Sequence, residues 1–177
     1  ASSGRTRSSD LKTLGLIGGM SWESTATYYR ALNEGVRDRV GGLHSAPLLM
    51  WSFDFAVIED CQMRGDWEQA TDLMIDAAAR LAGAGADGLM ICTNTMHRMA
   101  DEVVSHVDIP LLHIADATAV GIQQKGCHSP LLLGTRFTME QAFYKGRLQS
   151  QHGIDVMIPN AADREAVHRI IYEELCQ

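Results

Sequence analysis

The chain has 177 residues, 46% of them hydrophobic, and its 15 Lys and Arg against 22 Asp and Glu give a formal net charge of −7. Because no basic cluster could follow a phosphate backbone, nucleic acid is excluded as a partner. No apolar run reaches the roughly 20 residues that a membrane helix needs, and no signal-peptide hydrophobic region opens the chain. The sequence therefore predicts a soluble, cytoplasmic protein without a membrane partner.

The four cysteines are widely spaced and form no Cys-x-x-Cys pair, and the histidines show no metal-ligand spacing. We therefore expect neither a disulfide framework nor a metal site, and a reducing compartment suits the free thiols. The opening stretch, residues 1–11, is polar, rich in Ser and Arg, and without periodicity. It is interpreted as a disordered leader or a cloning remnant outside the fold.

The predicted elements alternate between strands and helices along the chain. Residues 12–18 are expected to form a buried strand that runs into a glycine turn, and a helix over 21–39 with Ser21 as its N-cap follows. The remaining predicted elements are a strand at 46–52, a loop or short helix at 53–64, a helix at 66–82, a strand at 88–91, a helix at 95–104, a strand at 109–114 and a helix at 116–124. Such alternation is typical of a parallel α/β sheet covered on both faces.

Two stretches of the chain share one pattern of apolar strand, glycine and helix. The first ends its strand at Gly18 and the second at Gly134, and a Tyr and a Leu that follow each glycine keep the same offset of 116 residues. An internal duplication explains this constant spacing. It predicts a first α/β domain over residues 12–118 and a partial second α/β domain over residues 119–177.

A cysteine directly after the predicted strand at 88–91 is the first candidate for chemistry. In parallel α/β sheets, ligands bind beyond the carboxyl ends of the strands, where helix N-termini point amide donors at them. Such a helix end can lower the pKa of Cys92, and Thr93, Asn94 and Thr95 could hydrogen-bond the sulfur or a substrate carboxylate. The alternative is that Cys92 is a small, buried hydrophobic residue.

Other polar positions allow both a functional and a structural interpretation. The segment Gly18–Ser21 could receive a carboxylate or phosphate at a helix N-terminus, or it could be a tight turn only. Neither Gly-x-Gly-x-x-Gly nor Gly-Lys-Ser/Thr occurs here, which disfavours a dinucleotide or a nucleoside triphosphate. His97 could polarise the thiol, or it could cap a helix or sit in the core. Asp54, Asp60 and Gln62 could reach a ligand or be solvated.

Three motifs, Gly18–Thr25, Cys92–His97 and Leu133–Glu140, occur in an order that resembles the aspartate/glutamate racemase family. The similarity is closest to the bacterial broad-specificity amino-acid racemase branch. The resemblance implies two similar α/β domains with parallel sheets and flanking helices, an active site in the cleft between them, and no need for pyridoxal phosphate or metal. It also implies a homodimer, because relatives commonly form dimers.

The resemblance further implies a two-base reaction on a small-molecule amino acid. One cysteine thiolate removes the α-proton, and a second cysteine, as a thiol, returns a proton to the opposite face. By match to the family motif, Cys92 is the first acid/base. The residues implied to contact the substrate are Met20, Ser21, Gln62, Thr93, Asn94 and Thr135.

The sequence departs from the family pattern at the second cysteine. That cysteine belongs to a Gly-Cys-Thr-Glu type motif, which does not occur in the 177 residues, and Cys176 follows Glu-Glu-Leu in a helical pattern instead. We therefore expect an incomplete second domain without the second base. Trp51 occupies a region where some aspartate-specific members use an arginine, so aspartate is not expected as the only substrate.

Three functions remain open from the sequence. The first is a cofactor-independent amino-acid racemase for aspartate, glutamate or a broader set of amino acids. The second is another superfamily enzyme, such as a hydantoin racemase or a one-cysteine decarboxylase, which the motifs around Met20 and Cys92 disfavour. The third is an inactive carboxylate-binding module, which the missing second base favours.

Overall fold

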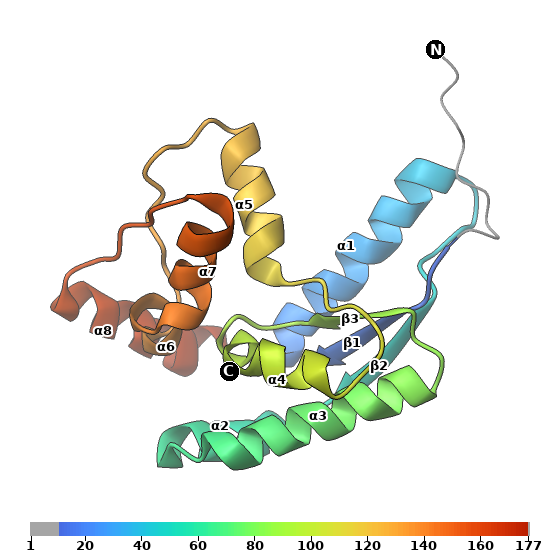
Figure 1. Cartoon of the computed structure of the whole chain (residues 1–177), viewed down its shortest axis with the longest axis horizontal. Helices are drawn as coiled ribbons and strands as arrows, with labels where there is room; N and C mark the ends of the chain where they lie inside the picture. Colours follow the sequence, from blue (N-terminus) through green and yellow to red (C-terminus); the bar gives the residue numbers. More distant parts are fainter. Residues whose placement is uncertain (1–10, 177) are drawn as a thin grey trace. The chain divides into compact units, whose positions relative to one another are not determined.

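The computed structural model describes residues 11–176 (Figure 1). The predicted leader, residues 1–11, lies outside this range except for its last residue. Contacts divide the described chain into two units, of which the first runs to Thr93 and includes Asp101–Leu111. The second comprises Asn94–Ala100 and the chain from Leu112 onward. The domain limits at 12–118 and 119–177 stay a prediction.

The first unit is built on a three-stranded parallel sheet in the order β2-β1-β3. Its strands are β1 (Leu14–Gly18), β2 (Leu48–Ser52) and β3 (Gly88–Ile91). Within the central strand, Leu16 and Ile17 are fully buried, as expected for a strand covered on both faces. Leu14 pairs with Leu48 on one side and with Gly88 on the other, so all three strands end at the same edge of the sheet.

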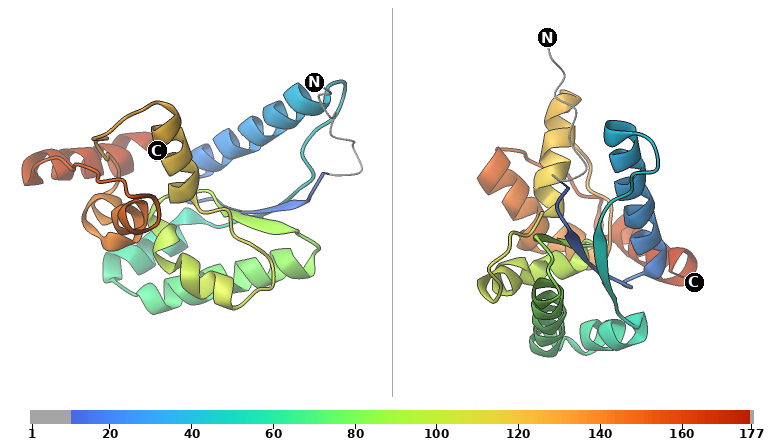
Figure 2. Two further views of the ribbon diagram at one scale, coloured as in Figure 1. Left: turned by 45° about the horizontal axis from the view of Figure 1, so that its top comes forward. Right: turned by 90° about the vertical axis from the view of Figure 1, so that its right-hand side faces the viewer.

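Helices cover both faces of this sheet. The helices that follow its strands are α1 (Trp22–Val40), α2 (Phe55–Arg64), α3 (Trp67–Gly83) and α4 (Ala100–Ser105). Figure 2 shows α1 on one face of the sheet and α2 with α3 on the other. The predicted helical period of α3 is confirmed, because its buried residues are Ala70, Met74, Ala77, Ala78 and Leu81. The predicted α/β class with a parallel sheet and flanking helices is therefore confirmed.

The described part of the second unit consists mainly of helices. They are the 3₁₀ helix η2 (Thr95–Met99), α5 (Ile114–Gln124), α6 (Arg136–Glu140), α7 (Ala142–His152), α8 (Ala161–Ile170) and the π-helical turn η3 (Ile171–Leu175). A single parallel bridge joins Leu131 to Met157, at the place where the second copy of the repeat predicts a strand. The predicted helix at 95–104 is present, but its first half is the 3₁₀ turn η2.

The strand predicted at 109–114 is wrong. The chain makes one isolated bridge there, between Leu89 and Leu111, and Pro110 has no N–H to continue a ladder. The carbonyl of Pro110 accepts a hydrogen bond from the N–H of Leu89 at 2.8 Å. His113 already serves as the N-cap of α5, with Nδ1 accepting from the N–H of Ala115, so the apolar end of the run belongs to a helix.

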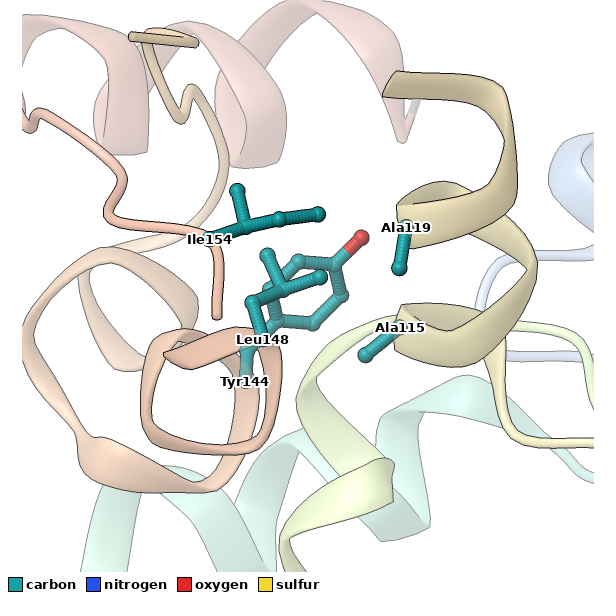
Figure 3. Packing of buried hydrophobic residues seen from close by; sticks show 5 residues of the cluster. All are labelled: Ala115, Ala119, Tyr144, Leu148 and Ile154. Atoms are coloured by element: carbon teal, nitrogen blue, oxygen red, sulfur yellow. The ribbon is translucent and has the colours of Figure 1, made fainter. Parts of the chain in front are cut away.

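A small hydrophobic cluster holds α5 against α7 (Figure 3). Its buried members are Ala115, Ala119, Tyr144, Leu148 and Ile154. The phenol oxygen of Tyr144 lies 2.9 Å from Oγ1 of Thr118, which satisfies its buried polar group. In the first copy of the repeat, Tyr28 and Leu32 are only half-buried. The repeated positions therefore contribute differently to the two units.

A charged network on the same two helices surrounds Asp116. Nε and Nη2 of Arg147 each donate to a different carboxylate oxygen of Asp116 at 2.8 Å, and Nε2 of His152 also lies 2.8 Å from it. The Arg147 hydrogen bond, and then that of His152, hold the pKa of Asp116 well below its usual range. Since the native state favours the ionised carboxylate, this network stabilises the fold above about pH 4 and loses that contribution as the pH falls further.

We expect Asp116→Asn to lower the free energy of unfolding at about pH 7 by about 1 kcal/mol, a small value because the Asp116 side chain is 38% exposed. The difference from wild type should shrink below about pH 4, because the Asp116 carboxyl of the unfolded wild-type chain then binds a proton, whereas the native carboxylate stays ionised to lower pH. Urea unfolding followed by far-UV circular dichroism measures both. Asp38→Asn is the control, since its carboxylate is 75% exposed and 4.0 Å from Arg37. An equal loss at both pH values would contradict the assignment.

Candidate functional site

The turn after β1 is shaped by two close backbone approaches. A Cβ at Gly18 would lie 2.5 Å from Cγ2 of Thr25, and a Cβ at Gly19 would meet the backbone of Phe53. Gly19 also has φ +84°, a conformation that favours glycine. Both glycines are therefore required by the turn itself, which supports the structural interpretation of this motif beside the functional one.

Thr25 holds this turn from inside α1. Its Oγ1 accepts from the N–H of Gly19 at 2.9 Å and donates to the carbonyl of Ser21 at 3.0 Å. Ser21 has the extended backbone of an N-cap, but its side chain makes no cap hydrogen bond. The predicted N-cap position of Ser21 is therefore confirmed, although its side chain does not form the expected cap hydrogen bond. Both Met20 and Ser21 are buried.

Cys92 lies directly after β3 and beside the central strand. Its N–H donates to the carbonyl of Ile17 at 2.9 Å, which extends the parallel pairing by one residue. The turn that carries Met20 follows β1 and Cys92 follows the neighbouring β3, so both segments lie at the carboxyl edge of one sheet. The structure thus brings together these two segments, as the sequence predicted.

The thiol of Cys92 is fully buried, and this burial raises its pKa to about 12. The expectation that a helix end lowers this pKa is therefore wrong. The helical segment that follows begins with the 3₁₀ turn η2 of five residues before it continues as α4, and a 3₁₀ turn has poorer hydrogen-bond geometry than an α-helix. Desolvation disfavours the thiolate more than such a turn favours it, so Cys92 is a neutral thiol at physiological pH.

The other predicted contacts of the first unit are Gln62 and Thr93. Gln62 is buried on α2, together with Ile58 and Cys61. Thr93 follows Cys92 and is half-buried. Their polar side chains come from segments that follow β2 and β3, which are the two outer strands of the sheet.

The second unit contains the predicted contacts Asn94 and Thr135. Asn94 is exposed and precedes η2. Thr135 is the N-cap of α6, and its Oγ1 accepts from the N–H of Thr138 at 3.3 Å and lies 3.0 Å from Oγ1 of Thr95. Oγ1 of Thr138 lies 3.2 Å from Oγ1 of Thr135. Three hydroxyl groups therefore cluster here, and the sequence had not singled out Thr138.

Two buried histidines form a second cluster in the same unit. The rings of His97 on η2 and His113 before α5 meet edge to face, with centroids 4.6 Å apart. Nε2 of His97 accepts from the N–H of Ile114 at 3.2 Å. The sequence left open whether His97 has a chemical or a capping role. It did not single out His113, and the one signal for a capping role there is its position just before a helical pattern.

A hollow of about 790 Å³ lies on the first unit, between α1 and β2. Its wall includes the exposed aromatic residues Trp22 and Tyr29 together with Arg30, and it includes none of the predicted site residues. It nevertheless borders the Gly18–Ser21 turn, because Thr25, which hydrogen-bonds Gly19, also lines it.

Neither a metal site nor a membrane-spanning helix is found among residues 11–176. No group of three or more His, Cys, Asp or Glu side chains in this range is arranged to hold a metal ion. Within the same described range, no helix is both long and apolar enough to cross a membrane.

These features define an α/β protein in which a buried cysteine and a glycine turn share the carboxyl edge of a parallel sheet. The family model for Asp/Glu/hydantoin racemases matches residues 17–175, and the chain belongs to that family. The resemblance seen in the three sequence motifs is thereby confirmed. A curated relative, the broad specificity amino-acid racemase RacX of Bacillus subtilis, is 27% identical over 129 residues, which cover 63% of this chain and 56% of RacX. The chain thus spans little more than half of that relative's length.

Solved structures agree with this assignment. A candidate Asp/Glu racemase from Yersinia pestis is 57% identical with a TM-score of 0.86, covering 94% of this chain and 72% of that chain. An aspartate racemase homologue from Pyrococcus horikoshii is 36% identical with a TM-score of 0.79, covering 93% of this chain and 72% of that chain. The aspartate racemase of Picrophilus torridus, at 20% identity and a TM-score of 0.69 over 91% of this chain and 73% of its own, shares the fold.

We expect iodoacetamide to alkylate Cys92 far more slowly than the exposed Cys127 at about pH 7, because burial blocks access and raises the Cys92 pKa to about 12. Peptide mapping by mass spectrometry measures both rates in one sample. Protein unfolded in urea is the control, since both thiols should then react with a pKa of about 8.5. Equal rates in the folded protein would show that Cys92 is not the buried thiol described here.

We expect Thr25→Val, which keeps the side-chain shape, to lower the free energy of unfolding of the first unit by about 1–3 kcal/mol, because it leaves the Gly19 N–H without its acceptor. Thr25→Ser keeps the hydroxyl and should cost less. Tryptophan fluorescence during urea unfolding reports on this unit, which contains all three tryptophans. If Thr25→Ser lowers the free energy of unfolding more than Thr25→Val does, the effect comes from side-chain packing and not from the hydrogen bond.

Proposed function

We propose that this protein is a cofactor-independent amino-acid racemase in which Cys92 is one of two cysteine acid/bases. The single observation that carries the proposal is the place of Cys92, at the carboxyl end of β3 beside the Gly18–Ser21 turn, in a chain of the racemase family. A cysteine in a motif of the family's second type does not occur in these 177 residues. The proposal therefore concerns a protein in which this chain acts together with such a cysteine.

The proposed reaction conserves protons over one turnover. A thiolate takes the α-proton and becomes a thiol, and the electron pair of the broken C–H bond stays on the α-carbon and its carboxylate. The opposite thiol then delivers its proton to the other face and becomes the thiolate. The product has inverted configuration, and the two sulfurs have exchanged protonation states. The reverse reaction begins from that exchanged state.

The burial of Cys92 bears on its role in the proposed cycle. Because burial raises the Cys92 pKa to about 12, we propose that Cys92 is protonated when the substrate binds and donates its proton in that direction of the reaction. To act as the base in the other direction, its thiolate needs a nearby positive charge. The α-ammonium group of a bound amino acid can supply that charge, since an opposite charge within about 4–6 Å favours the ionised form.

The remaining predicted residues have roles that suit an amino-acid ligand. The hydroxyl groups of Ser21 and Thr93 and the amide of Gln62 are candidates for binding the carboxylate, whose negative charge grows as the α-proton leaves. Met20 supplies an apolar contact. Asn94 and Thr135 are proposed as polar contacts from the second unit.

The residue at position 51 supports a range of amino acids in preference to aspartate alone, because Trp51 occupies a region where some aspartate-specific members of the family use an arginine. We propose acidic or small polar amino acids as substrates, in line with the name of the RacX relative. We also propose a homodimer.

An inactive carboxylate-binding module is the second candidate. It is favoured by the high pKa of Cys92 and by the lack of a second cysteine in a motif of the family type. A one-cysteine decarboxylase and a hydantoin racemase are further members of the same superfamily, and they differ from an amino-acid racemase in their products.

We expect Cys92→Ser in the full-length protein to lower racemisation of L-aspartate, L-glutamate or L-homoserine by about 10²-fold or more, because it removes one acid/base. Chiral chromatography measures the enantiomers, and mass spectrometry in D₂O measures exchange of the α-proton. Cys127→Ser, at an exposed thiol, is the matched control and should keep wild-type rates.

The outcomes separate the candidate functions. Ligand binding by wild type without α-proton exchange would reject the racemase and support the binding module. Exchange without inversion would indicate a one-base enzyme, and carbon dioxide release would indicate a decarboxylase. Wild-type rates in Cys92→Ser would reject Cys92 as an acid/base.

A further inference from the structure

The start of α5 in the second unit is capped by two imidazoles from separate segments. Nε2 of His97, on η2, accepts from the N–H of Ile114, and Nδ1 of His113 accepts from the N–H of Ala115 at 3.1 Å. These amides are the first two of α5 and have no partner within the helix. Both histidines are buried, with 2% and 7% of their surface exposed.

These contacts fix the protonation of both rings. A backbone N–H can only donate, so each of the two accepting nitrogens must carry a lone pair instead of a proton. His97 and His113 are therefore both neutral, with the single ring hydrogen on Nδ1 of His97 and on Nε2 of His113. Protonating either accepting nitrogen would break one cap of α5.

The surroundings add electrostatic reasons for a neutral pair. The ring centroids are 4.6 Å apart, so two imidazolium charges would repel each other, and the positive end of α5 would oppose both. The charged and titratable groups on the three elements that meet here are Arg98 of η2, Asp116 of α5, and Lys145, Arg147 and His152 of α7. The charge of Asp116 interacts favourably with a charged His113, but Asp116 is already bound to Arg147 and His152.

We propose that His97 and His113 are positioning residues, which fix η2 to the start of α5 as neutral hydrogen-bond acceptors. The segment fixed in this way begins at Asn94 and Thr95, directly after Cys92 and Thr93 in the chain. Its meaning for catalysis rests on the proposed racemase function. The capping geometry itself does not.

Matched variants separate acceptor chemistry from packing. In His97→Gln the side-chain Oε1 can replace Nε2 as acceptor, and in His97→Phe the ring remains without an acceptor. Amide hydrogen exchange of Ile114 and Ala115, followed by NMR and corrected for intrinsic rates, reads each cap separately. We expect His97→Phe to lower the protection of Ile114 by about 10-fold and that of Ala115 far less, and His97→Gln to recover most of the loss. Likewise, we expect His113→Phe to lower the protection of Ala115 more than that of Ile114, and His113→Asn to recover most of that loss.

Acidification provides a second readout in the same proteins. Protection at Ile114 should fall in wild type once the pH is low enough to protonate His97, because the proton and the Ile114 N–H then compete for Nε2. His97→Gln, which cannot titrate, should show a flatter profile. Equal loss of Ile114 protection in the His97→Gln and His97→Phe variants would overturn the capping proposal.

Catalytic assays of the full-length protein then test the positioning role. We expect His97→Phe to lower kcat/KM for racemisation and His97→Gln to retain most of it. If His97→Phe loses the cap but racemises like wild type, the positioning role is rejected although the capping geometry stands. If wild type shows no racemisation, the proposed function fails, while amide exchange still decides whether the two imidazoles hold η2 to α5.

Discussion

The parallel pairing of β1 with β3 is the constraint on which the first half of the candidate site depends. Ile17 pairs with Ile91, and the carbonyl of Ile17 accepts the N–H of Cys92. A slip of one residue would send alternate side chains to the opposite face of the sheet. The register therefore determines which side chains of β1 are buried, and it places Cys92 one residue beyond the last paired residue of β3. Thr25 adds to this by tying Gly19 and Ser21 to α1.

The burial that fixes Cys92 also determines its chemistry. A thiol with a pKa near 12 is almost wholly protonated at neutral pH, so its thiolate is seldom available as a base. Desolvation also strengthens any interaction between the sulfur and a nearby positive charge. In the proposed racemase, the reactivity of Cys92 therefore depends on the charge of the bound amino acid.

The sequence predicted the first unit well, because each strand of its sheet is an apolar run closed by a recognisable turn. β3 was predicted with the limits that the structure has, and the edge at which Cys92 lies followed from the parallel α/β pattern. The run Ile109–Ile114 was wrongly predicted as a strand, because an apolar run with a proline near its start suits an edge strand. In the structure, His113 caps α5 instead, so the end of this run belongs to a helix. The repeat located Tyr144 and Leu148 correctly on a helix, but not the break between α6 and α7.

The contacts that escaped the sequence share one physical cause: they are side-chain hydrogen bonds between segments that lie far apart in the chain. η2 is a 3₁₀ turn of five residues, which has weaker backbone hydrogen bonds than an α-helix and little stability alone. Its position depends on Thr95 beside Thr135 and on His97 beside Ile114. Helical propensity carries no information about either partner. The segment that follows Cys92 is therefore held by tertiary contacts, so substitutions at Thr135 or His113 can act on it without changing any local helical preference.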